Sequence, residues 1–242
     1  NELAYFMLLG QGDTPVTFAG KTVKLSKDIE WNDGTIVNGV FTAGESGVIY
    51  EWKSYASTQS VSAHTYAFQG TFDGGLHTIT GLYINGTGFF NVVKAATIQN
   101  VCFEKCYLST DKNQVGIVAS RSIFTNNFLR IHLMGCYLNT SGAYAGGVLG
   151  APANGTGTRN FNDCVVDKST SLTAATKAGS FVGQNFKGNL NLTECINFTN
   201  NQYVAIGGAD KTESSIDVKV TNCLTVNENE TKLYDSDANT WT

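Results

Sequence analysis

The chain contains little proline and little charge for its length. Only 2 of its 242 residues are proline, and Asp, Glu, Lys and Arg together make up 15%. Proline cannot donate to the hydrogen-bond ladder of a sheet, so its scarcity is compatible with strands along most of the chain. Hydrophobic residues make up 42%, and a chain of this size can bury a continuous core.

Several kinds of chemistry lack the residues that they need. The 3 histidines, His64, His77 and His132, do not have metal-binding spacing, and no two cysteines form a C-x-x-C pair. No nucleophile-elbow, phosphate-binding or dinucleotide-binding motif is present. None of the 3 arginines lies beside the acidic cluster that a calcium-dependent polysaccharide lyase requires. We therefore expect neither a metal nor a cofactor.

Acidic side chains are the remaining catalytic candidates. Asp73, Glu104, Asp163 and Glu194 could in principle form an inverting pair across neighbouring coils. All four occupy expected corners of the chain, where Asp, Asn and Gly are typical of turns. We assign no catalytic residue and favour a non-catalytic protein, with an enzyme acting on carbohydrate as the alternative.

The charge balance and the short apolar runs argue against two further classes of partner. Lys and Arg number 16 against 20 Asp and Glu, which gives a net charge of −4. This leaves no positive surface for nucleic acid or for an anionic membrane. No segment reaches the roughly 18 apolar residues that a membrane-spanning helix needs, so we expect no span.

A regular series of cysteines is the most informative feature that is present. Five of them are separated by 28 to 31 positions: Cys106, Cys136, Cys164, Cys195 and Cys223. The residues five and three positions before each cysteine are apolar in every case but Arg159, and the residues between them are mostly polar or small. This alternation predicts one half-buried strand per repeat, with a polar corner just before the cysteine.

A fixed period of about 30 residues that carries a strand predicts a solenoid of stacked coils. Each repeat also has an apolar segment led by glycine, at 116–118, 146–149 and 179–182, which predicts a further wall of the coil. Consecutive coils would pair as parallel strands about 4.8 Å apart. The sequence therefore predicts an all-β solenoid.

The same spacing predicts how the cysteines lie. If all five occupy one corner of successive coils, their Cα–Cβ bonds run parallel and their Cβ atoms lie farther apart than a disulfide favours. We therefore predict free thiols that fill the same corner of every coil as small buried hydrophobes and set its register. Cys102 alternates with Val101 and Phe103, and we expect it to face outward and to be the one reactive thiol.

The N-terminal part carries weaker signals. Residues 2–9 are mostly apolar without alternation and end at Gly10, which predicts a helix within 1–12 that caps the open end of the solenoid. Residues 20–31 are expected to form the first coil strand. A short coil is expected between two sets of residues that match at an offset of 19: Ile79, Leu82 and Ile84 with Ile98, Val101 and Phe103.

Residues 32–67, which we call the insertion, do not follow the pattern of the repeat. They form either a coil with strands of its own, such as 47–52, or a functional excursion. Exposed Trp and Tyr rings bind sugars, so the candidate ligand-binding residues here are Trp31, Tyr50, Trp52, Tyr55 and Tyr66. The alternative is that about half of these rings fill the core of an irregular coil.

Two stretches resemble known bacterial proteins. Residues 68–82 resemble the signature F-x-G-x-F-D-G-x-x-H-x-I-x-G-L of β-helical surface proteins of gut and oral bacteria, and 21–31 resemble the opening of the same proteins. Residues 145–150 and 178–183 resemble the GLUG-type repeats of adhesins, which also precede the catalytic part of IgA-protease-like metallopeptidases. The resemblance implies a single-stranded right-handed parallel β-helix at the cell surface, as part of a larger protein, and it implies no activity.

These observations lead to one leading hypothesis and several alternatives. We expect a single domain over 1–242, with regular coils at 68–230 and a polar tail at 231–242. Its expected function is that of an extracellular, non-catalytic adhesin-like or stalk module, monomeric, which contacts host glycans or surface proteins. The alternatives are a carbohydrate-active β-helix, such as a lyase or glycosidase, an accessory domain of a surface peptidase, and a trimeric receptor binder like a phage tailspike.

Overall fold

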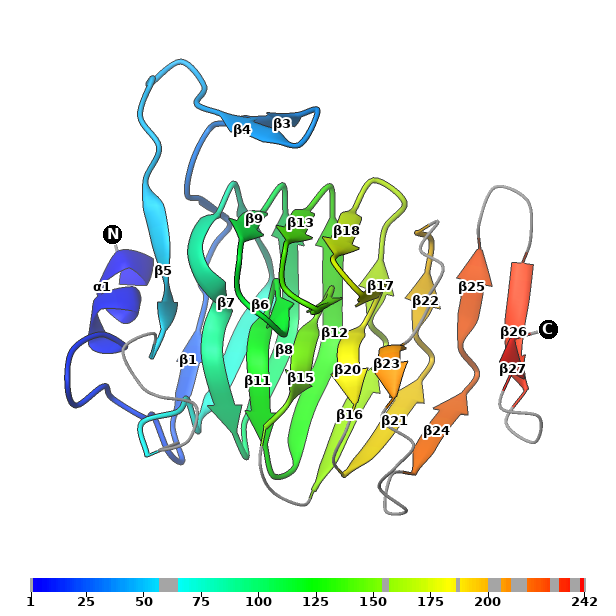
Figure 1. Cartoon of the computed structure of the whole chain (residues 1–242). Helices are drawn as coiled ribbons and strands as arrows, with labels where there is room; N and C mark the ends of the chain where they lie inside the picture. Colours follow the sequence, from blue (N-terminus) through cyan, green and yellow to red (C-terminus); the bar gives the residue numbers. More distant parts are fainter. Residues whose placement is uncertain are drawn as a thin grey trace.

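The computed structural model shows a solenoid of parallel β-strands with one helix at its N-terminal end (Figure 1). It describes residues 2–56, 65–153, 157–185, 188–199, 206–209, 217–226, 231–235 and 240–241, with the backbone alone for 206–209, 231–235 and 240–241. The prediction of an all-β parallel solenoid with an N-terminal helix is confirmed. No helix in these ranges is long and apolar enough to cross a membrane.

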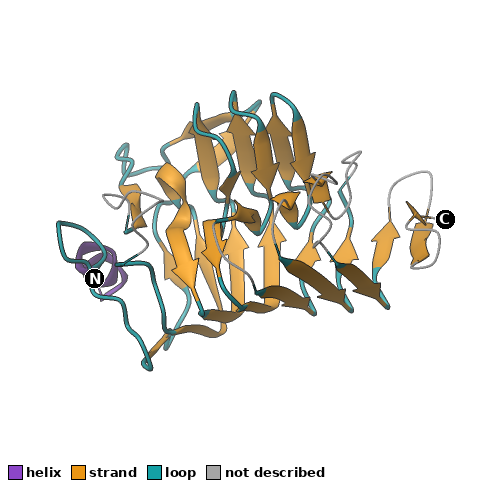
Figure 2. Ribbon diagram, turned by 60° about the horizontal axis from the view of Figure 1, so that its bottom comes forward, coloured by secondary structure: helices purple, strands orange, loops and turns teal. Residues whose placement is uncertain are grey.

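Three sheets, parallel except at the last two strands of the first sheet, form the walls of the coils, and Figure 2 shows their strands stacked along the axis. The first sheet contains β1 (Thr22–Lys24), β2 (Ile29–Glu30), β6 (Thr71–Thr80), β8 (Thr97–Glu104), β12 (Asn126–Met134), β16 (Thr158–Asn162), β17 (Val165–Val166), β21 (Asn189–Thr193), β22 (Ile196–Asn197), β24 (Val218–Thr221), β25 (Leu224–Val226), β26 (Thr231–Asp235) and β27 (Thr240–Trp241).

The other two sheets close the coil. The second contains β5 (Glu51–Tyr55), β7 (Tyr83–Lys94), β9 (Tyr107–Thr110), β11 (Ala119–Ile123), β13 (Tyr137–Thr140), β15 (Leu149–Pro152), β18 (Ser171–Ala174), β20 (Val182–Asn185) and β23 (Ile206–Ala209). The third contains β10 (Val115–Gly116), β14 (Tyr144–Gly146) and β19 (Lys177–Gly179). Each of these strands ends at the glycine that begins a predicted apolar segment, and in the later two repeats the last residue of that segment, Leu149 or Val182, begins a strand of the second sheet. A Cβ at Gly146 would lie 2.0 Å from the Leu149 carbonyl oxygen, so the close approach of two backbones requires glycine there.

Two columns of left-handed residues turn the chain at the corners. One column lies at the corner partway along the first sheet, and its residues have φ between 51° and 55°: Asn100, Arg130, Asp163, Glu194 and Asn222. The other contains Gly81, Lys105 and Gly135, with φ of 73°, 50° and 60°. Each turn sends the next residue into the core, which accounts for the polar corner that the sequence predicts.

The prediction of one cysteine column is wrong. Cys106 and Cys136 face each other in neighbouring coils, because Glu104 pairs with Met134 and Tyr107 with Tyr137. Phe161, however, pairs with Phe128 and Val165 with His132, which places Cys164 opposite Ile131.

The cysteines therefore form two columns at different corners. Cys164, Cys195 and Cys223 continue the column of Val101 and Ile131, whereas Cys106 and Cys136 continue that of Leu82. The apolar pattern before the cysteine is common to both corners, and this similarity hides the change. All five are buried and none forms a disulfide, as expected of small core residues, and Cys102 is half-buried.

The short coil expected from an offset of 19 is also absent. β6 pairs with β8 through Phe72 with Ile98 and Ile79 with Phe103, and the register shifts between Asp73 and His77. This bulge, at Gly74 and Gly75, adds residues to one strand, so the true offset is 24 to 26.

The two ends of the solenoid are closed in different ways. At the N-terminal end the core is aromatic, and Phe6 of α1 (Glu2–Leu9) packs against Phe72, Phe89 and Phe90. Helix α1 is thus a plug for the open end, as predicted. At the other end β26 of the predicted polar tail pairs antiparallel with β25, and β27 pairs with β26.

Polar residues also stack from coil to coil. Asn191 Nδ2 donates to Asn160 Oδ1 at 3.0 Å, Asn160 Nδ2 to Asn127 Oδ1 at 2.9 Å, and Asn127 Nδ2 to Thr97 Oγ1 at 3.2 Å. Arg159, at an inward position, is fully buried and donates to Ser122 Oγ at 3.0 Å and to the Gly157 carbonyl at 3.1 Å.

Candidate functional site

The insertion resolves into two parts, a hairpin and a coil strand. β3 (Thr35–Val37) and β4 (Val40–Thr42) pair antiparallel, and the hairpin reaches over the ends of β9 and β13 (Figure 1). β5 then rejoins the solenoid by pairing parallel with β7. The prediction of a coil strand in the insertion is confirmed, although β5 begins at Glu51 and Val48 and Ile49 lie outside it. The hairpin departs from the coil, and a function for it stays a prediction.

Aromatic contacts hold the hairpin on the coils. Tyr83, Tyr107 and Tyr137 stack on successive coils, with ring centroids 5.2 and 5.3 Å apart. Phe41 of the hairpin, 6% exposed, contacts the rings of Tyr83 and Tyr107. The Tyr107 hydroxyl donates to the Gly39 carbonyl at 3.2 Å. The hairpin is thus held at its turn, through Gly39, and along β4, through Phe41.

Two of the five candidate aromatic residues belong to the core. Trp52 is 0% exposed, stacks on Phe89 with centroids 4.3 Å apart, and donates from Nε1 to the Phe89 carbonyl at 3.0 Å. Tyr55 is also 0% exposed, stacks on Phe6, and donates its hydroxyl to the Val16 carbonyl. Burial raises the pKa of Tyr55. Neither ring offers a face to a ligand, which corrects the expectation for these two residues.

Trp31 and Tyr50 lie together at the base of the hairpin. Trp31 is half-buried, meets Trp52 edge to face at 5.3 Å, and donates from Nε1 to the Tyr50 carbonyl at 2.9 Å. Tyr50 is 60% exposed. Tyr66, also half-buried, does not line the same cavity. The structure therefore places Trp31 and Tyr50 together and places Tyr66 away from them.

A buried asparagine fixes the position of Tyr50. Asn32 is 4% exposed and follows Trp31 at the first corner. Its Nδ2 donates to the carbonyls of Gly81 at 2.7 Å and of Tyr50 at 3.0 Å, and its Oδ1 accepts from the Tyr50 N–H at 2.7 Å. The sequence alone did not single out Asn32. One signal could have identified it. Asn32 comes directly after the predicted first coil strand, at the position where later coils have Leu82 or a cysteine.

These residues surround a cleft of about 210 Å³, which we call the Trp31–Tyr50 pocket. The residues that line it are Glu30, Trp31, Asn32, Asp33, Ser46, Val48 and Tyr50. Asp33 accepts from the Ser46 N–H at 3.3 Å and from its hydroxyl at 3.1 Å. The backbone hydrogen bond from Ser46 is the main reason why the pKa of Asp33 is lowered, so this carboxylate is ionised at neutral pH.

The candidate catalytic carboxylates have structural roles. Asp73 Oδ1 accepts from the Gly75 N–H and from Asn100 Nδ2, both at 2.9 Å. Partial burial opposes ionisation of Asp73, but these hydrogen bonds outweigh it and lower the pKa, whereas a general acid needs a raised one. Glu104 accepts from the Thr80 hydroxyl, and Asp163 and Glu194 occupy exposed corners of neighbouring coils.

Histidines and cysteines do not gather into a metal centre within the described ranges. No group of three or more His, Cys, Asp or Glu side chains there is placed to hold a metal ion. His77 Nδ1 lies 3.2 Å from Asp28 Oδ1, which also accepts from the Thr78 N–H at 2.9 Å. His132 is half-buried, and His64 lies outside the described residues.

Comparisons with known proteins identify no family for this chain. No family model matches it, and no curated protein matches it either. A crystal structure from Bacteroides ovatus, described as that of a "putative immunoglobulin A1 protease", is similar over 90% of this chain and 74% of its own, with 14% identity and a TM-score of 0.45. A likeness this low has no bearing on the activity of the chain.

Proposed function

We propose that this chain is a non-catalytic, carbohydrate-binding module of an extracellular protein, in which the β-helix is a rigid support and the Trp31–Tyr50 pocket contacts the sugar. The observation that carries the proposal is the rigid presentation of an exposed aromatic ring. Tyr50 is 60% exposed, yet both its backbone N–H and its carbonyl are bound by Asn32. A residue whose backbone is held in place before binding loses less conformational entropy on contact.

The surroundings of the ring suit a sugar. A pyranose has an apolar face that can pack on Tyr50 and Trp31, and hydroxyl groups that can donate to carboxylates. Glu30 and Asp33 supply such acceptors at the edge of the same cleft. Binding sites for drug-sized ligands have volumes of roughly 300–1,000 Å³. At about 210 Å³ the Trp31–Tyr50 pocket therefore fits one sugar ring, so we expect weak binding that multivalent display strengthens.

A glycan array tests this proposal with two tyrosine variants of similar exposure. Tyr50→Ala removes the ring in the pocket, whereas Tyr5→Ala removes a ring that is 64% exposed on α1, away from the pocket. We expect the wild type and Tyr5→Ala to share a set of glycan hits that Tyr50→Ala loses.

Two results would contradict the proposal. If no glycan binds even in multivalent display, the chain is a spacer or binds protein. If the bound glycan is shortened during incubation, as seen by mass spectrometry, the chain is an enzyme rather than a binding module.

A further inference from the structure

The first coil has an edge that no described strand covers. β1 and β2 each pair with β6 on one side and with no other strand of the described ranges. The Leu25 N–H donates to the Asp73 carbonyl and the Lys21 carbonyl accepts from the Thr71 N–H, so the odd-numbered residues of β1 face β6. Main-chain groups alternate along a strand, and those of Thr22 and Lys24 therefore point away from the sheet.

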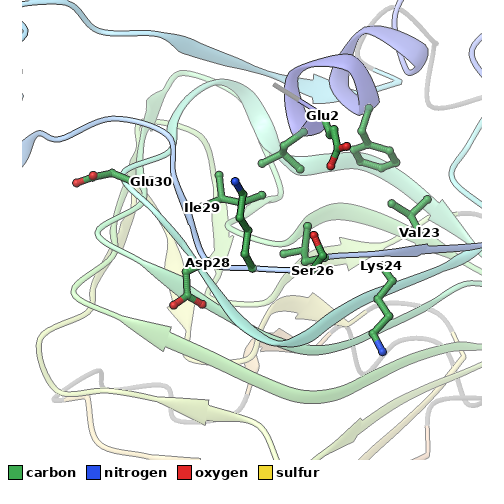
Figure 3. Close-up of a pocket in the computed structure, with 11 residues that line it drawn as sticks. Glu2, Val23, Lys24, Ser26, Asp28, Ile29 and Glu30 are labelled. Atoms are coloured by element: carbon green, nitrogen blue, oxygen red, sulfur yellow. The ribbon is translucent and has the colours of Figure 1, made fainter.

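A groove runs along this edge. Its volume is about 710 Å³, and it lies between α1 and the segment from Val23 to Glu30 (Figure 3). Its apolar residues are Leu3, Phe6, Val23, Leu25 and Ile29. Helix α1 packs on the aromatic core next to β5, and its residues Glu2, Leu3 and Phe6 line the groove opposite the β1–β2 segment.

The charged residues of the groove carry both signs. Glu2, Asp28 and Glu30 are acidic and Lys24 and Lys27 are basic, and the labelled side chains of Lys24, Asp28 and Glu30 point outward in Figure 3. The groove thus combines outward main-chain donors and acceptors, an apolar floor and a mixed charged rim. Main-chain groups at this spacing are matched by an extended backbone, and an apolar floor is matched by every second side chain.

We propose that this edge binds an extended peptide of another protein, which adds as a parallel strand to β1 and β2 and places alternate apolar side chains in the groove. A second copy of the chain fits less well as the partner. At the opposite end of the solenoid β26 already pairs antiparallel with β25, so this strand edge is not free to pair with β2 of a second copy.

The repeat itself supplies a probe. A synthetic peptide with the sequence of residues 97–104, in which Cys102 is replaced by Ser, reproduces a strand that pairs parallel on both its edges in this fold. Its apolar residues Ile98, Val101 and Phe103 all face the core in their own coil, with the left-handed corner residue Asn100 between the first two. We expect fluorescence anisotropy to show saturable binding of this peptide to the whole chain, and no binding of a peptide with the same composition but without alternation.

Two N-methylated peptides test the strand geometry on the unchanged protein. In one peptide, the N-methyl groups replace the amide hydrogens that would face β1. In the other peptide, they replace the amide hydrogens that would face solvent. We expect one set to abolish binding and the other to leave it within about twofold. If both sets or neither abolish binding, strand addition is refuted.

A variant of the protein tests the edge directly. Lys24→Pro removes a donor that points away from β6, and proline is tolerated on an edge strand. We expect an unchanged melting temperature and about tenfold weaker peptide binding. Unchanged peptide binding in this variant would overturn the proposal. If the wild type dimerises by light scattering and Lys24→Pro does not, the edge pairs two copies instead, and the peptide proposal is wrong. Glycan binding at the Trp31–Tyr50 pocket is expected to survive in this variant, which separates the two proposals.

Discussion

Replacing Asn32 by alanine removes the clamp that holds Tyr50 over the first corner. The side chain makes three hydrogen bonds, at 2.7 Å to the Gly81 carbonyl, at 3.0 Å to the Tyr50 carbonyl and at 2.7 Å from the Tyr50 N–H. A typical intramolecular hydrogen bond contributes about 0.5–1.5 kcal/mol net, so their loss costs roughly 1.5–4.5 kcal/mol. Because the Tyr50 carbonyl keeps the bond from Trp31 Nε1, we expect a value of about 2–3 kcal/mol.

Urea unfolding followed by Trp fluorescence measures this cost. Tyr50→Ala is the matched control, since it leaves the backbone bonds to Asn32 in place and removes an exposed ring. We expect Asn32→Ala to lower the free energy of unfolding and to abolish glycan binding, and Tyr50→Ala to abolish binding alone. A cost below about 0.5 kcal/mol for Asn32→Ala would refute the view that this residue organises the pocket.

Three further predictions concern stability and reactivity. The structure changes the expectation that Cys102 is the one reactive thiol, because burial raises its pKa from 9.0 to about 11 and its thiolate fraction at pH 8 falls about a hundredfold. We now expect iodoacetamide to label none of the six thiols in the time that labels the unfolded chain, and rapid labelling of Cys102 would contradict this. Arg159→Ala leaves a core cavity and removes the hydrogen-bond donors to Ser122 and to the Gly157 carbonyl, so we expect the free energy of unfolding in urea to fall by about 3 kcal/mol or more. A change below about 1 kcal/mol would show that Arg159 is not buried as described. Hydrogen bonds from the Thr78 N–H and from His77 lower the folded-state pKa of Asp28 below 3.8, so the stability that they give is present above that value and is lost as the pH falls further. We expect Asp28→Asn to flatten the pH dependence of the melting temperature below pH 4. An unchanged slope would count against this corner contact.

The fold could be predicted from the sequence because its period is long and its strands alternate. The pattern of apolar residues before each cysteine, at 101 and 103 or at 190 and 192, reports a strand followed by a corner. It does not report which corner, because both corners have a left-handed residue followed by an inward one. The interval from Cys136 to Cys164 is 28 residues, but Phe128 and Phe161, which pair, are 33 apart. The residues after the cysteine differ, Tyr-Leu at 107 and 137 but Val-Val at 165, and this was the usable signal.

The candidate site could be predicted only in part. Period-two alternation would place Tyr50 and Trp52 on the same face, but β5 begins at Glu51, so Tyr50 lies outside the strand and is exposed whereas Trp52 faces the core. Composition alone placed both in one class. The hairpin of β3 and β4 is held by the stacked tyrosines of later coils, a long-range contact that no local pattern reports. Asn32 was missed because its partners, Tyr50 and Gly81, lie 18 and 49 residues away.

The most direct test of a rigid support with one sugar-binding pocket is a calorimetric titration of the best glycan from the array into three proteins. These are the wild type, Tyr5→Ala and Tyr50→Ala, with tyrosines that are 64% and 60% exposed in the wild type. The account predicts equal affinity for the first two, loss of detectable binding in the third, and the same melting temperature for all three. Binding that survives in Tyr50→Ala, or is lost equally in Tyr5→Ala, would contradict it.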